Sequence, residues 1–190
     1  VRSFDRWLGE LLDGLRARGL DERTILVVTS DHGEQLGEEG RPAPYGDGFY
    51  NVHGHSLFEE MIRVPLIVRL PGQDEGRRIP EVTASIDVMP MLLDLLGLPV
   101  PPEVQGQSLR PLWEETGEWE PRAALSESLS EQEEQKGLRD DRYKLVLSVA
   151  AETVAARGRG FVPPDAPAAL FDLVRDPGEE QDLMGGATDE

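Results

Sequence analysis

The three histidines of this chain all fall within one stretch of 24 residues. His32 follows Asp31 in the segment Thr-Ser-Asp-His-Gly, and His53 and His55 lie in His-Gly-His-Ser. Histidine is the commonest metal ligand, and its charge changes readily near neutral pH. This clustering beside a carboxylate predicts half of a metal-dependent site for the transfer of an anionic group.

Asp31 and His32 offer a carboxylate oxygen and an imidazole nitrogen to a divalent cation. A site completed mainly by oxygens would hold calcium, whereas further nitrogens would favour zinc or manganese. The alternative is structural, with Asp31 capping the following turn and His32 as an ordinary loop residue. For an isolated Asp-His pair, that structural alternative is favoured.

His53 and His55 are separated by Gly54, which in a loop lets the backbone approach a ligand closely. An imidazolium at either position could bind an anionic oxygen, protonate a leaving group or complete a metal shell. The alternative is a turn with two solvated histidines.

The other charged side chains that stand out are expected to serve the structure. Glu59 and Glu60 are assigned to a helix surface or cap, and Asp87 to a helix N-cap. The basic residues near position 140 are expected on the solvent-facing side of an edge strand: Arg139, Arg142 and Lys144.

The elements around the histidines predict an α/β sheet. Apolar residues at three- and four-residue steps predict an amphipathic helix over residues 1–18, which Gly19 ends. Residues 24–29 are dense in β-branched residues, as in a strand buried on both faces of a parallel sheet. This strand would deliver Asp31 and His32 at its carboxyl end, where such sheets bind ligands. Residues 34–52 are expected to form a loop.

Further along the chain, helices and strands continue to alternate. We expect a short helix over residues 56–62, with Ser56 as N-cap and Glu59 completing a capping box. The remaining expected elements are a strand at 64–70, a helix within 82–96, a connector at 99–111, and strands at 123–130, 138–149 and 169–174. The expected domains are an α/β core over 1–118, a small antiparallel α+β subdomain over 119–176, and an acidic tail over 177–190.

Composition narrows the range of functions. The net charge of −18 argues against a role in nucleic-acid binding or in docking on an anionic membrane. The sequence contains no run of 18 apolar residues, so it predicts no membrane span. The absence of cysteine rules out disulfides and thiolate ligands, and it fits both the cytosol and a periplasmic or secreted bacterial enzyme. Because a helical pattern is already running at Val1, we expect the sequence to begin inside a larger protein.

The ordered set of motifs resembles the C-terminal half of a type I sulfatase. The segments that carry the resemblance are Thr-Ser-Asp-His-Gly-Glu, His-Gly-His-Ser-Leu-Phe-Glu-Glu-Met-Ile-Arg-Val-Pro, Ser-Ile-Asp-Val-Met-Pro-Met-Leu-Leu-Asp-Leu-Leu-Gly, Arg-Asp-Asp-Arg-Tyr-Lys-Leu and Leu-Phe-Asp-Leu-Val-Arg-Asp-Pro. The resemblance implies an alkaline-phosphatase-like mixed sheet flanked by helices, followed by the small antiparallel subdomain.

The resemblance also implies roles for individual residues. Asp31 matches a family metal ligand and His32 the residue beside it, with calcium as the usual ion and zinc or manganese as alternatives. His53 and His55 occupy the region that binds the sulfate and protonates the leaving group, and His55 is the better match. Glu39 stands where many members have histidine.

The family's nucleophile is a formylglycine made from Cys/Ser-x-Pro-x-Arg, and this chain contains no such motif. The usual Asp-Asp pair of the metal site is missing as well. We therefore expect a chain that needs the N-terminal half of the protein and that acts on a small-molecule or glycan sulfate ester. The alternatives are a phosphodiesterase or phosphonate monoester hydrolase of the same superfamily, and a non-catalytic binding or structural domain.

Overall fold

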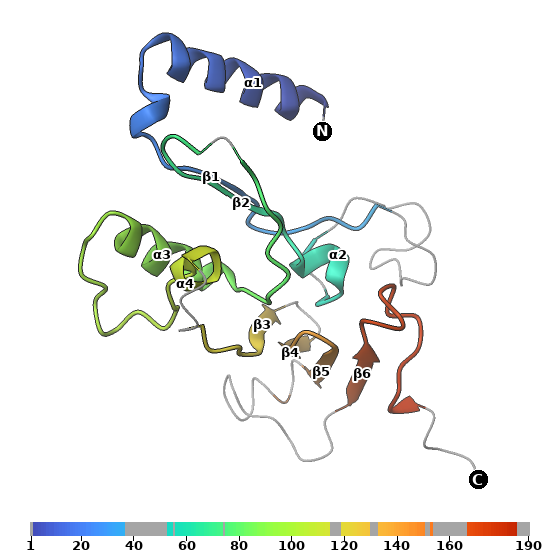
Figure 1. Ribbon diagram of the computed structural model, residues 1–190. Coiled ribbons are helices and arrows are strands. Elements are labelled where there is room, and N and C mark those ends of the chain that lie inside the picture. Colours follow the sequence, from blue (N-terminus) through green and yellow to red (C-terminus); the bar gives the residue numbers. More distant parts are fainter. Residues whose placement is uncertain are drawn as a thin grey trace. The chain divides into compact units, whose positions relative to one another are not determined.

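The computed structural model describes residues 2–36, 53–54, 56–73, 75–114, 119–129, 133–150, 153 and 167–185. The chain divides into two compact units (Figure 1). The first comprises Val1–Asp31 and Val64–Arg78, and the second comprises His32–Arg63 and Ile79–Glu190.

The first unit contains a helix and a pair of strands. Helix α1 (Arg2–Ala17) confirms the predicted amphipathic helix, and Gly19, at φ 61°, follows its end. A 3-10 turn, η1 (Asp21–Arg23), leads into β1 (Leu26–Thr29), which pairs with β2 (Leu66–Arg69).

The pairing of β1 with β2 is antiparallel, whereas the sequence predicted a parallel neighbour. The side chains of β1 are half-buried or exposed, so the expected burial on both faces is not observed either. A short β-branched run specifies extended backbone, but it does not specify the direction of the partner strand.

The second unit contains the remaining helices. They are α2 (Glu59–Ile62), the 3-10 turn η2 (Ser85–Asp87), α3 (Val88–Leu95) and α4 (Arg110–Glu114). The predicted helix within residues 82–96 therefore begins as a 3-10 turn, and Gly97 at φ 67° follows its end. Over the described parts of the chain, the helices are too short or too polar to cross a membrane.

Asp87 joins α3 to the connector that follows it. Its carboxylate is fully buried and accepts hydrogen bonds from the backbone N–H of Ala84 at 2.8 Å and of Gln107 at 2.9 Å. It also forms an ion pair with Arg122. The predicted N-cap role is wrong in detail, because the side chain bonds back to Ala84 and makes no capping bond to α3.

Replacing Asp87 by alanine is expected to destabilise the fold by at least about 2–3 kcal/mol, since hydrogen bonds to a buried charged group are worth about 1.5–3 kcal/mol each. Urea unfolding of the variant measures this loss. Glu103→Ala, at an exposed position of the same connector, serves as control and is expected to change stability by less than about 0.5 kcal/mol. Equal stability of the two variants would contradict the prediction.

A four-stranded antiparallel sheet follows, in the order β3 (Ala124–Leu129), β4 (Glu133–Arg139), β5 (Tyr143–Ala150) and β6 (Ala168–Asp172). Three of these strands were predicted, and β4 was not. The predicted strand at 138–149 is divided by a turn in which the Asp140 carboxylate accepts hydrogen bonds from the N–H groups of Arg142 and Tyr143.

The expectation of a solvent-facing edge strand is wrong for Arg139 and Lys144, which lie on the two interior strands, whereas Arg142 lies in the turn before β5. Strand β5 is central, and Lys144 on it is fully buried. Arg139 bonds Glu59 at 3.2 Å, and Arg142 bonds Asp172 at 2.8 Å. The hydrogen bond from Arg142 lowers the pKa of the Asp172 carboxyl group. Each of these cations has a carboxylate partner, but only Lys144 is fully buried, and the side chain of Arg142 remains 43% exposed.

Candidate metal centre

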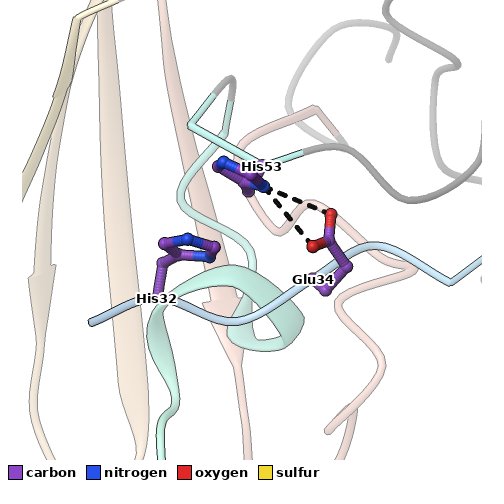
Figure 2. Close-up of side chains that lie close together, drawn as sticks. All are labelled: His32, Glu34 and His53. Atoms are coloured by element: carbon purple, nitrogen blue, oxygen red, sulfur yellow. Dashed lines mark hydrogen bonds and ion pairs between the residues drawn. The ribbon is translucent and has the colours of Figure 1, made fainter. Parts of the chain in front are cut away.

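Three potential metal ligands come together in the second unit: His32, Glu34 and His53 (Figure 2). One ligand atom from each lies within 4.8 Å of the others. The rings of His32 and His53 are stacked, with centroids 3.9 Å apart. The Glu34 carboxylate lies 3.4 Å from Nδ1 of His53. The cluster therefore joins two segments that are well separated in the sequence.

The first of these segments is held by the carbonyl groups of α2. The N–H of Gly33 donates to the Met61 carbonyl at 2.7 Å, and that of Glu34 donates to the Glu60 carbonyl at 3.0 Å. The approach requires glycine, because a Cβ on Gly33 would lie 1.9 Å from the carbonyl oxygen of Glu60. Gly33 thus brings the backbone between His32 and Glu34 into direct contact with α2.

The second segment is held by the antiparallel sheet. The hydroxyl of Ser128 on β3 donates to the carbonyl of Gly54 at 2.9 Å, directly after His53. Gly54 has φ 79°, a conformation that favours glycine. Gly54 therefore turns the chain directly after His53.

The hydrogen bond of His32 defines its tautomer. Nδ1 lies 2.6 Å from the carbonyl oxygen of Gly33. Since a carbonyl oxygen only accepts, Nδ1 donates in this bond, and Nε2 is the nitrogen that a neutral ring would offer to a cation. A backbone carbonyl on one ring nitrogen is the usual way in which proteins orient a histidine ligand.

Two imidazoles and one carboxylate suit a divalent cation. Zinc is commonly held by three such ligands plus a water or substrate, and imidazole ligands favour transition metals. Calcium takes six to eight oxygens, so this donor set alone suits it less well.

The predicted site residues have different outcomes. His32 and His53 lie together, whereas Asp31 belongs to the first unit and the cluster to the second. His55 and Glu39 lie outside the described residues. Glu34 was not predicted. The Asp-His-Gly-Glu segment offered a signal for it, since residues two apart on extended backbone point the same way.

The family model described as Sulfatase matches residues 1–98. The chain belongs to the sulfatase family. It is 37% identical over 107 residues to arylsulfatase K of Bos taurus, covering 56% of this chain and 18% of that protein. The chain thus spans less than a fifth of this relative's length.

Solved structures show where the sulfatase fold is shared. A 2-O GAG sulfatase matches with TM-score 0.62 and 26% identity, over 87% of this chain and 32% of its own. A phosphonate monoester hydrolase from Silicibacter pomeroyi matches with TM-score 0.69 and 29% identity, over 96% of this chain and 35% of its own. The predicted alkaline-phosphatase-like α/β fold class is confirmed.

Proposed function

We propose that this chain is the metal-binding, C-terminal portion of a sulfatase that hydrolyses sulfate esters. The observation that supports the proposal is the convergence of His32, Glu34 and His53 in a member of the sulfatase family. A bound divalent ion would supply positive charge to the oxygens of the sulfate group. The acid and the metal ligands would come from this chain, and the nucleophile from residues N-terminal to it.

The proposal assigns a role to each candidate site residue of the chain. His32 and Glu34, together with Asp31 as the predicted family ligand, would hold the cation. His53 would contact the cation or the sulfate, and His55 would bind the sulfate and protonate the leaving alkoxide. The division into a core over 1–118, a subdomain over 119–176 and a tail over 177–190 forms part of this proposal.

Hydrolysis of phosphate or phosphonate esters is the second candidate. The solved phosphonate monoester hydrolase supports it, since it covers 96% of this chain. Sulfuryl and phosphoryl groups are both tetrahedral and anionic, so the same metal ligands would serve either. Because the solved 2-O GAG sulfatase covers 87% of the chain, a glycan sulfate ester is the substrate class to test beside aryl sulfates. The third candidate is a non-catalytic domain that binds the cation without turnover.

Metal titration tests the shared part of these proposals. Calorimetry with Zn²⁺, Mn²⁺ and Ca²⁺ added to the purified chain is expected to show binding of one ion, and the donor set favours zinc or manganese over calcium. Failure of all three ions to bind would refute the metal site. Binding of calcium in preference to zinc would show that oxygen ligands such as Asp31 dominate it.

The isolated 190-residue chain is expected to have negligible sulfatase activity, because it contains no formylglycine motif. The chain joined to an upstream sequence that carries Cys/Ser-x-Pro-x-Arg is expected to hydrolyse an aryl sulfate faster than a phosphonate monoester. The reverse preference would favour the phosphonate monoester hydrolase. Turnover of an aryl sulfate by the isolated chain, abolished by His55→Ala, would contradict the need for a separate nucleophile.

A further inference from the structure

A group of buried and half-buried charges joins the antiparallel sheet to α2. It consists of Lys144 on β5, Arg139 on β4, Glu59 on α2 and Glu179 near the C-terminus, and is called here the Lys144 cluster. The side chains of Lys144 and Glu179 are both fully buried and form an ion pair. Lys144 also lies 3.4 Å from the Glu59 carboxylate, which bonds Arg139 as well.

Glu179 is held in a strained conformation. Among the described residues, it is the only one other than glycine with a positive φ, at 54°. Such a conformation is unfavourable for a residue with a side chain and persists where the surroundings enforce it. Here the Glu179 carboxylate accepts a hydrogen bond from the N–H of Glu59 at 2.7 Å. Glu179, from the C-terminal segment, thus accepts the hydrogen bond of the first N–H group of α2. Ser56 was predicted as the N-cap of this helix, but the N-cap position is Phe58.

The preceding residues hold Glu179 in place. Its N–H donates to the carbonyl of Asp176, and the Asp176 carboxylate accepts from the N–H groups of Glu180 and Gln181. Burial raises the pKa of the Glu179 carboxyl group, and the neighbouring Lys144 opposes that shift. The first acidic residue of the segment predicted as an acidic tail is therefore buried and paired.

The Lys144 cluster connects directly to the segments that carry the candidate ligands. Nζ of Lys144 donates to the carbonyl of Leu57 at 2.7 Å, on the segment that follows His53. At the other end of the same short stretch, the carbonyls of Glu60 and Met61 accept from Glu34 and Gly33. The position of α2 is thus set by the cluster on one side, and it sets the backbone of Glu34 on the other.

We propose that Lys144 and Glu179 are positioning residues for the metal site. They hold α2 against the sheet, so that Glu34 and His32 stay within coordinating distance of His53. Apolar residues could fill the same space at no cost in stability, because a buried ion pair often stabilises a fold no more than a hydrophobic replacement does. The directional contacts of the ammonium and carboxylate groups instead fix one position of α2. This inference rests on the metal site proposed above.

Zinc binding measured by calorimetry on the full chain tests the proposal. Lys144→Met and Glu179→Gln are expected to weaken zinc binding 10- to 100-fold, the range typical of residues that support ligands without touching the metal. The double variant is expected to resemble the single variants, because the two residues act as a pair. Lys136→Met is the matched control, since Lys136 on β4 pairs with Glu127 and Glu134 of the sheet itself. It is expected to bind zinc as the unsubstituted chain does.

A spectroscopic readout separates positioning from stability alone. With cobalt(II) in place of zinc, Glu179→Gln is expected to alter the visible absorption of the bound ion at a temperature where the variant is fully folded by circular dichroism. If Lys144→Met does not fold, Glu179→Gln decides, because the amide retains the size of the carboxylate. Folded variants with unchanged zinc affinity and cobalt spectrum would overturn the proposal. No zinc binding by the unsubstituted chain would overturn the metal site, and this inference with it.

Discussion

The variant His32→Ala is expected to bind zinc at least about 100-fold more weakly than the unsubstituted chain. Loss of a supporting residue alone costs 10- to 100-fold in metal affinity, and His32 is placed here as a direct ligand through Nε2. His53→Ala and Glu34→Gln are expected to have effects of the same order, because each removes one of the three donors within 4.8 Å. Calorimetric titration with zinc measures all three.

Glu103→Gln is the control for these ligand variants, because it removes an exposed carboxylate that is not one of the three candidate ligands. Its zinc affinity is expected to match that of the unsubstituted chain. If His32→Ala and His53→Ala both bind zinc normally, the site lies elsewhere and the assignment fails. If only Glu34→Gln binds normally, Glu34 orients His53 through their hydrogen bond and does not coordinate the ion.

The variant Gly33→Ala is expected to damage both stability and metal binding. A Cβ would lie 1.9 Å from the carbonyl oxygen of Glu60, and the obstacle is backbone, which cannot rotate away. The segment must therefore move off α2, weakening the hydrogen bonds donated by Gly33 and Glu34. We expect a loss of about 1–3 kcal/mol in the free energy of unfolding, with zinc affinity reduced as Glu34 shifts.

Gly9→Ala is the control for the glycine substitution. Gly9 lies inside α1, and an added Cβ would meet nothing within 4 Å. Alanine there is expected to stabilise the helix by about 0.5–1 kcal/mol, because glycine loses more freedom when it becomes helical. Urea unfolding of both variants makes the comparison. Gly33→Ala with unchanged stability and zinc affinity would show that the close approach to α2 is unimportant.

Local patterns predicted the elements that contain apolar residues. Helix α1, strands β1 and β2, and the helix ending at Gly97 are found close to the predicted positions, because regular apolar spacing and terminal glycines act locally. Strand β4 was missed because its sequence, Glu-Glu-Gln-Lys-Gly-Leu-Arg, is almost entirely polar. It is extended because β3 and β5 supply its hydrogen bonds on both sides.

The charged residues were also hard to assign, because their partners come from distant parts of the sequence. A lysine such as Lys144 is ordinarily placed on the surface, and its burial depends on Glu179, which lies 35 residues further along the chain. The N-cap of α2 was assigned to Ser56 from a local capping pattern, yet the carboxylate that bonds the helix start comes from Glu179. Local sequence does not reveal partners that the fold brings from a distance.

The candidate site shows both what local sequence predicts and what it leaves out. The identity of the histidines and their neighbour Asp31 predicted metal chemistry, and the structure brings His32 and His53 into contact. Glu34 was overlooked because glutamate is common in acidic loops. Its approach to His53 results from two hydrogen bonds to α2, which no sequence pattern indicates.

The two ligand-bearing segments are held by different hydrogen bonds. Gly33 and Glu34 are bonded to α2, and Gly54 is bonded to Ser128 on β3. The distance between His53 and the pair His32 and Glu34 is therefore set by backbone hydrogen bonds to α2 and by the bond to β3. A substitution at one of these anchors would release one ligand segment while the other keeps its own bond.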